Sequence, residues 1–174
     1  MIDFDFLPKD TCRGSSMLVA ATLENGDLPE APHLSAFEDP RLDEISIFIE
    51  FEESVSRSFS NLRRYIEDQR NRGRRVAGYG GWGRGVTTLA MAKLTEDHLE
   101  FVVDGNANLH GCFTPVTGFP ITGPESVTRE AVDEVIVFNY GYIEEIKHTL
   151  SDFIAKGGKV TSVLDLLSPA ASPA

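Results

Sequence analysis

The sequence predicts an α/β protein with a Rossmann-like three-layer fold, in which helices cover both faces of a mainly parallel sheet, together with an N-terminal strand and a long helix. Two observations lead to this class. From Arg75 onward, short apolar runs alternate with helical patterns. A glycine-rich turn directly follows the first of these runs. We therefore expect one domain over residues 1–166 and a flexible tail of small residues and prolines over 167–174.

One strand is predicted near the N-terminus. Residues 17–23 form an apolar run, with Gly14 before it and the turn-like sequence Asn25-Gly26-Asp27 after it. An apolar run between such turn signals is typical of a strand.

A long amphipathic helix is predicted next. Asp39 and Pro40 have the residue types of a helix N-cap and a first helical position. Apolar side chains then recur at intervals of three, four and seven, and the helix should end near Gly73. Its start is open, because alternating β-branched and aromatic residues also indicate a strand: Ile45, Ile47, Ile49 and Phe51.

The second half of this helix is rich in arginine. Cations are stabilising near a helix C-terminus, so one interpretation is a solvated helix end. The other is a face that docks an acidic partner. Seven of the sixteen basic residues are involved: Arg57, Arg63, Arg64, Arg70, Arg72, Arg74 and Arg75.

The remaining elements follow in alternation. Gly157-Gly158 should stop the last helix, as C-cap glycines do. The expected elements are strands at 76–77, 99–103, 135–138 and 159–164, a helix over 86–92, and a helix with Ile143, Ile146, Leu150 and Phe153 or Ile154 on one face.

Charge and composition exclude several classes of function. The formal net charge of −11 repels polyanions, so nucleic acid is not an expected partner. No apolar run is long enough to span a bilayer and the N-terminus has no signal-peptide pattern, so we expect a cytoplasmic protein without a membrane partner. Cys12 and Cys112 form no Cys-x-x-Cys pair and are expected to be buried or half-buried thiols. The four histidines show no metal-ligand spacing, and we expect no metal and no cofactor.

The glycine-rich turn is the strongest candidate for a binding site. Gly78–Gly83 fits the pattern G-x-G-x-x-G between a predicted strand and a predicted helix, and Asp104 stands at the end of the next strand. Backbone amides at a helix N-terminus favour an anion. Arg84 could add a positive charge and Thr87 a hydroxyl. These features predict phosphate or nucleotide binding, and the alternative is that the glycines only allow tight packing of strand and helix.

Several segments together resemble the C-terminal domain of sugar C-methyltransferases, enzymes that modify the 3-position of nucleotide-linked deoxysugars in natural-product pathways. The resemblance covers residues 12–165 and is most specific in the turn Tyr-Gly-x-x-x-(Lys/Arg)-Gly-x-Thr and in the sequel Asp104, Asn106, Gly111. It rests on residues 75–87, 99–104, Gly111, 113–115, 120–121, 138–139 and 157–159.

The resemblance implies a Rossmann-like domain that holds the nucleotide end of a sugar substrate. In that family, preceding zinc-binding and methyltransferase modules carry the metal, methyl donor and catalytic residues; this sequence contains neither. We therefore expect a free-standing nucleotide or nucleotide-sugar binding domain in secondary metabolism, without its own methyl-transfer machinery. The predicted ligand-binding residues are Gly80, Gly81, Trp82, Gly83, Arg84, Gly85, Thr87, Asp104, Asn106 and Asn139.

The sequence departs from the family at several positions. Val86 stands where asparagine is usual, and Gly118 replaces a usual histidine. Gly105, Leu109 and Cys112 occupy positions that are usually basic or polar. Because charge-assisted hydrogen bonds contribute strongly to binding, these losses weaken the case for a nucleotide diphosphate.

Three alternatives remain open. The first is a small biosynthetic enzyme that reuses the pocket for cyclisation, elimination or isomerisation, with Asp104, His110 and Tyr140 as candidate catalytic residues and Trp82 either stacking on the substrate or covering the sheet end. The second is a nicotinamide-dependent oxidoreductase, and the third a structural subunit of a split methyltransferase. The expected partners are a small-molecule ligand and either a second copy of the chain or a separate catalytic subunit.

Overall fold

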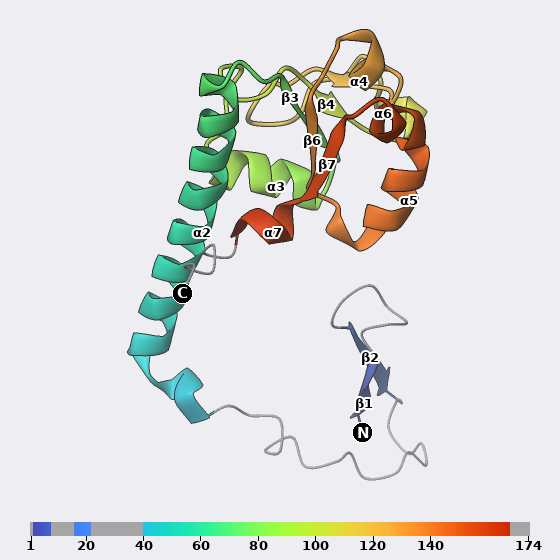
Figure 1. Ribbon diagram of the computed structural model, residues 1–174. Helices are drawn as coiled ribbons and strands as arrows, with labels where there is room; N and C mark the ends of the chain where they lie inside the picture. The colour runs from blue at the N-terminus through green and yellow to red at the C-terminus, as the bar shows by residue number, and fades with distance from the viewer. Residues whose placement is uncertain (1, 8–15, 22–39, 168–174) are drawn as a thin grey trace. The chain divides into compact units, whose positions relative to one another are not determined.

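The computed structural model describes residues 2–7, 16–21 and 40–167, with side chains over 41–167 (Figure 1). The chain divides into two units, residues 1–52 and 53–174, and each is described by itself. The single domain over 1–166 stays a prediction. Residues 168–174 of the expected tail lie outside the described residues, and Leu167 ends a helix.

The first unit contains a pair of antiparallel strands. β1 (Ile2–Leu7) lies beside β2 (Ser16–Ala21), with Ile2 opposite Ala21 and Leu7 opposite Ser16. The strand expected at 17–23 is therefore confirmed within the described residues. β1 was not expected, although its alternating Asp3 and Asp5 are typical of a half-buried strand.

The second unit has a five-stranded, wholly parallel sheet in the order β5-β4-β3-β6-β7. β3 therefore lies at the centre, and the chain moves outward to β4 and β5 before it returns to β6 and β7 on the other side of β3. The strands are β3 (Val76–Tyr79), β4 (Val102–Val103), β5 (Ile121–Thr122), β6 (Glu134–Val137) and β7 (Lys159–Ser162).

Helices cover both faces of this sheet, as predicted (Figure 1). On one face, Leu62 and Leu89 pack with Ile136; on the other, Ile146 and Phe153 pack with neighbouring strand residues. The first face carries α2 (Ile45–Asn71), α3 (Arg84–Met91) and α7 (Val163–Leu167), and the second carries α4 (Ser126–Arg129), α5 (Ile143–Thr149) and α6 (Ser151–Ala155). Short 3-10 turns complete the described elements: η2 (Pro40–Asp43), η3 (Ala107–Leu109) and η4 (Tyr140–Tyr142).

The structure decides the start of the long helix, which the sequence left open, and it corrects several predicted boundaries. Residues 45–51 are helical and not a strand, and Pro40 opens the 3-10 turn η2 ahead of α2. The helix expected at Val86 already begins at Arg84, and the strand expected over 99–103 is limited to residues 102–103. The helix expected after residue 143 is interrupted at Leu150. The last strand ends at Ser162, because α7 begins at Val163.

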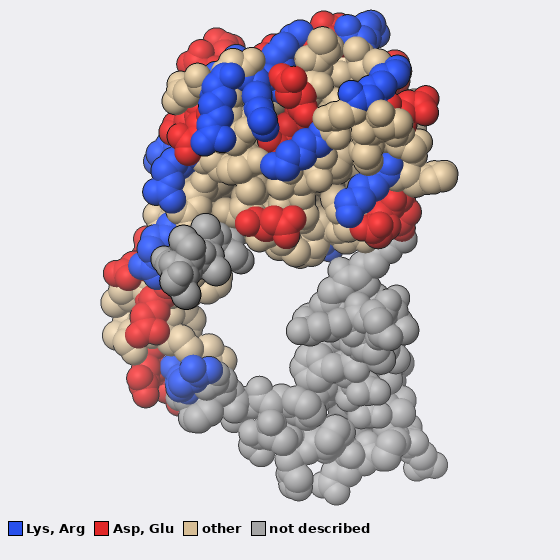
Figure 2. Space-filling model, viewed as in Figure 1, with Lys and Arg blue, Asp and Glu red and all other residues tan. Residues whose placement is uncertain are grey.

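Acidic neighbours pair with several of the arginines of α2. Arg57 contacts Glu53 at 3.3 Å and Arg63 contacts Glu67 at 3.7 Å. Blue and red side chains alternate along this helix in Figure 2. The mixed charges favour the solvated-helix interpretation over a surface for an acidic partner.

A buried carboxylate ties α2 to the sheet. Glu134 is fully buried in β6 and accepts hydrogen bonds from the hydroxyl groups of Tyr65 (2.8 and 3.0 Å) and Thr161. The Nζ atom of Lys159 lies 3.0 Å from the same carboxylate and donates to the Tyr65 oxygen at 2.6 Å. We call Tyr65, Glu134, Lys159 and Thr161 the Glu134 cluster. Its members come from α2, β6 and β7, so it joins three elements of the second unit.

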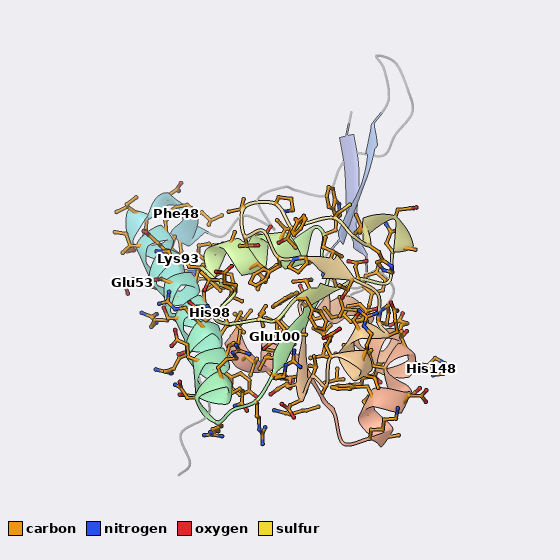
Figure 3. All side chains as sticks on the ribbon, turned by 90° about the horizontal axis from the view of Figure 1, so that it is seen from above. Phe48, Glu53, Lys93, His98, Glu100 and His148 are labelled. Carbon is orange, nitrogen blue, oxygen red and sulfur yellow. The ribbon has the colours of Figure 1, made fainter. Side chains whose placement is uncertain are left out.

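A second ionic cluster lies around Glu100 (Figure 3). Its carboxylate accepts hydrogen bonds from Arg70 and, at 3.2 Å, from Arg75. Burial alone would raise the pKa of Glu100, but the hydrogen bonds and charges of the two arginines outweigh it, and the pKa lies below its ordinary value of 4.5.

The Glu100 cluster should make stability depend on pH. Because the folded-state pKa is lowered, the contribution of Glu100 is fully present above pH 4.5 and is lost as the pH falls through the folded-state pKa. Glu100→Gln should therefore lower the free energy of unfolding by about 1 kcal/mol at pH 7 and by less at acid pH. Urea unfolding of both proteins at several pH values measures this difference. A difference that is the same at pH 7 and at pH 3 would contradict it.

Candidate functional site

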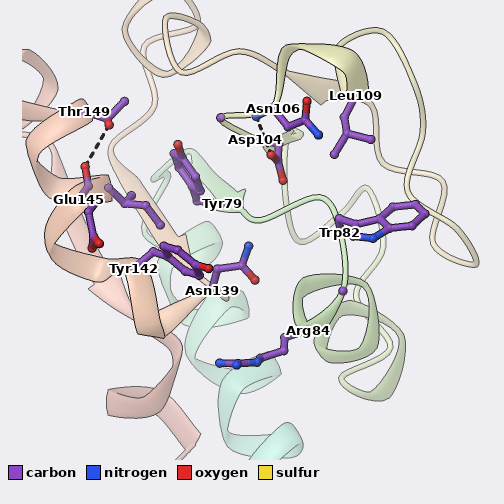
Figure 4. Close-up of a pocket in the computed structure, with 13 residues that line it drawn as sticks. Tyr79, Trp82, Arg84, Asp104, Asn106, Leu109, Asn139, Tyr142, Glu145 and Thr149 are labelled. Carbon is purple, nitrogen blue, oxygen red and sulfur yellow. Dashed lines mark hydrogen bonds between the residues drawn. The ribbon is translucent and has the colours of Figure 1, made fainter. Parts of the chain in front are cut away.

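A cleft of about 800 Å³ opens at the carboxyl ends of the central strands (Figure 4). Tyr79 from the end of β3, Asp104 beyond β4 and Asn139 beyond β6 all line it. The chain order of the strands reverses between β3 and β6. In open α/β sheets, ligands bind outside the carboxyl ends of the strands at such a reversal.

The glycine turn forms one wall of the cleft. Gly80 and Gly83 have φ values of +115° and +56°, which residues other than glycine rarely adopt. Gly85, at the start of α3, packs directly on the carbonyl oxygen of Gly80, and a Cβ atom there would overlap this oxygen. The glycines therefore allow α3 to begin in contact with the end of β3.

The amides of this turn are used in two ways. The Gly80 N–H donates to the Val103 carbonyl at 2.8 Å, and the Gly81 N–H donates to Asp104 Oδ2, also at 2.8 Å. The amides of Trp82 and Gly83 make no hydrogen bond within residues 40–167. These two amides, next to the N-terminus of α3, are suited to bind an anion.

Arg84 supplies positive charge to the cleft. Its guanidinium lies 5.1 Å from the centre of the Tyr140 ring, an arrangement typical of a cation–π contact. The other ionised side chains that line the cleft in the described part of the chain are acidic: Asp104 and Glu145. The Arg84 end therefore favours an anion, and the Asp104 end does not.

Asp104 holds the adjoining loop in place. Its Oδ1 accepts a hydrogen bond from the Asn106 N–H at 2.9 Å, while Asn106 Oδ1 accepts one from the Asn108 N–H. The Nε2 atom of His110 lies 2.8 Å from the main-chain oxygen of Asp104. Because a carbonyl only accepts, Nε2 must carry the proton of this bond.

Tyr79 lies beside Asp104 on the wall of the cleft (Figure 4). Its side chain is only 6% exposed. Burial and, to a lesser degree, the negative charge of Asp104 raise the pKa of Tyr79. The phenol therefore stays protonated at neutral pH and can donate a hydrogen bond.

The predicted ligand-binding residues divide into two groups. Six of them line the cleft: Trp82, Gly83, Arg84, Asp104, Asn106 and Asn139. The other four shape or flank the turn without lining it: Gly80, Gly81, Gly85 and Thr87. Trp82 is 64% exposed at the rim, so it does not cover the sheet end as a core residue.

Of the candidate catalytic residues, only one lines the cleft, and the other two contact residues of its wall. Asp104 lines it, whereas the His110 ring is bonded to the main chain and Tyr140 stacks against Arg84. Sequence reasoning did not single out Tyr79, Leu109 or Thr149 as cleft residues. For Tyr79 a signal existed, because it is the last residue of a strand that runs toward the site.

The other expected features have mixed outcomes. Cys112 is exposed, so the expectation of a buried or half-buried thiol is wrong, and Cys12 lies outside the described residues. His98 contacts Glu67 of α2, whereas His148 lies on α5, on the opposite face of the sheet (Figure 3).

Within the described ranges, no group of three or more potential ligands could hold a metal ion. No helix in these ranges is long and apolar enough to cross a membrane.

Comparison with known protein families identifies a relationship over most of the chain. The family model of the C-methyltransferase C-terminal domain matches residues 12–164. No curated protein matches the sequence.

Proposed function

Because the chain belongs to the C-methyltransferase C-terminal domain family, we propose that its cleft binds a nucleotide or a nucleotide-linked sugar in natural-product biosynthesis, and that it does not itself transfer a methyl group. One observation carries the proposal. Trp82 and Gly83, whose amides are unbonded within residues 40–167, line a cleft at the reversal of strand order together with the positively charged Arg84. A phosphate is the ligand group that suits this set of donors.

The acidic residues of the cleft limit how much negative charge it accepts. The Gly81 N–H already donates its hydrogen bond to Asp104, so it is not available to a phosphate. We therefore place the phosphates at the Arg84 end and the uncharged part of the ligand toward Asp104. This placement agrees with the absence of several basic residues that the family usually carries.

Binding should be measurable with thymidine diphosphate and thymidine-diphosphate glucose as probes. Each should raise the unfolding temperature of the protein at millimolar concentration, because a ligand that binds only the folded state stabilises it. Arg84→Ala should weaken binding of both probes by about tenfold, as expected for the loss of one charge-assisted hydrogen bond. Isothermal titration calorimetry measures the dissociation constants.

The control is Arg64→Ala, which removes an exposed arginine of α2 that does not line the cleft. It should leave both affinities unchanged. The proposal fails if wild-type protein binds neither probe, or if Arg84→Ala and Arg64→Ala have the same effect.

The alternative, a small enzyme that uses Asp104, His110 and Tyr140, stays a prediction. These side chains would have to converge on one ligand, and of the three only Asp104 lines the cleft. The nicotinamide-dependent oxidoreductase and the subunit of a split methyltransferase have no observation of their own in their favour.

A further inference from the structure

The ring of Tyr79 is buried, and its hydroxyl group is a donor that the described part of the protein leaves unused. The side chain is 94% buried and lines the cleft, yet its hydroxyl makes no hydrogen bond in the described part of the chain. Among the described residues only the Thr122 hydroxyl is fully buried without a partner, so the Tyr79 hydroxyl must be open to the cleft that this residue lines. The hydroxyl is therefore available to donate a hydrogen bond to a ligand in the cleft.

The surroundings of Tyr79 restrict what this partner can be. The hydroxyl lies next to the main chain of Gly105, 3.2 Å from where a Cβ atom of that residue would be. The neighbouring Asp104 carboxylate influences its pKa without being bonded to it. A group between the two side chains would thus face a donor on one side and a negatively charged acceptor on the other.

Asp104 has capacity for such a group. Each of its carboxylate oxygens accepts one main-chain N–H, from Gly81 and from Asn106. A carboxylate oxygen has two lone pairs, so each can accept one more hydrogen bond. The two main-chain bonds also fix the carboxylate in position before a ligand arrives.

Resting on the proposed function, we infer that Tyr79 and Asp104 form a subsite for a hydroxyl group of a sugar ring. An alcohol is the group that can accept from the Tyr79 phenol and donate to the Asp104 carboxylate at the same time. An ionised phosphate oxygen cannot donate and would be repelled by Asp104. The subsite therefore determines the orientation of the bound ligand, with its phosphates at Arg84 and a sugar hydroxyl at Tyr79.

The test is Tyr79→Phe, which removes only the hydroxyl oxygen and keeps the packed ring. Titration calorimetry with thymidine-diphosphate glucose should give a dissociation constant about tenfold larger than that of wild-type protein. Thymidine diphosphate, which lacks the hexose, shows which sugar of the ligand supplies the hydroxyl group that Tyr79 binds. If its affinity is unchanged, the hexose supplies the group, and if its affinity falls equally, the deoxyribose does.

Stability provides an independent readout. Since the Tyr79 hydroxyl makes no hydrogen bond to any residue that the structure describes, Tyr79→Phe should change the unfolding temperature of the unliganded protein by less than about 2 °C. Tyr65→Phe is the matched control, because its hydroxyl bonds Glu134 outside the cleft. It should lower the unfolding temperature and leave the affinity for both probes unchanged.

The inference is overturned if Tyr79→Phe binds both probes within twofold of wild type. In that case the proposed function still stands if Arg84→Ala weakens binding. If wild-type protein binds neither probe, the proposed function fails first, and the subsite fails with it.

Discussion

Gly85→Ala is expected to lower the free energy of unfolding by about 2–4 kcal/mol and to abolish ligand binding. The added methyl group would overlap the carbonyl oxygen of Gly80, which is main chain and cannot rotate away. Either α3 or the end of β3 must shift, and the amides of Trp82 and Gly83 would shift with them. Urea unfolding measures the first effect and calorimetry with thymidine diphosphate the second.

The direction of this effect is informative. Gly85 lies inside a helix, where alanine normally stabilises by up to about 1 kcal/mol relative to glycine. A stabilised or unchanged protein would therefore show that α3 does not contact Gly80 as described. Gly73→Ala is the control, because a Cβ atom at Gly73 meets no atom within 4 Å. It should cost only about 1 kcal/mol, for the positive φ value.

Glu134→Ala should be the most destabilising change outside the glycine turn, at about 3–5 kcal/mol. The substitution removes a fully buried carboxylate and leaves a cavity in β6. Tyr65 and Thr161 would lose their acceptor, and Lys159 would lose its counter-charge. Chemical unfolding at pH 7 measures the loss.

Two further variants separate the causes. Glu134→Gln keeps the volume and removes the charge, and it should cost about half as much as alanine if charge and packing contribute equally. Glu144→Ala removes an exposed partner of Lys147 and should cost less than about 0.5 kcal/mol. Equal losses for Glu134→Ala and Glu144→Ala would contradict the role given to the Glu134 cluster.

The parallel sheet and its helices could be predicted because their patterns are long and regular. The run 135–138 is wholly apolar and buried, as the strands of a sheet covered on both faces are. β5 has only two residues and follows Pro120, so no periodicity could indicate it. The residues of α7 are apolar and follow a strand without a turn signal, and for this reason they were assigned to the strand.

The candidate site was predictable where the main chain determines it. Asp104 and Asn139 follow strands that end at the same sheet edge, so both had to lie near the glycine turn. Side-chain contacts decided the rest. The His110 ring turns to a carbonyl group and the Tyr140 ring to Arg84, and no spacing in the sequence indicates either contact.

The centre of the sheet has a consequence for how this domain can vary. A Cβ atom at Gly78 would lie 2.5 Å from the ring of Phe138, which is itself 1% exposed. The two positions, 60 residues apart, share a single volume between neighbouring strands. A larger residue at 78 is therefore compatible only with a smaller one at 138. Glycine in β3 leaves the space that the Phe138 ring, directly after β6, fills.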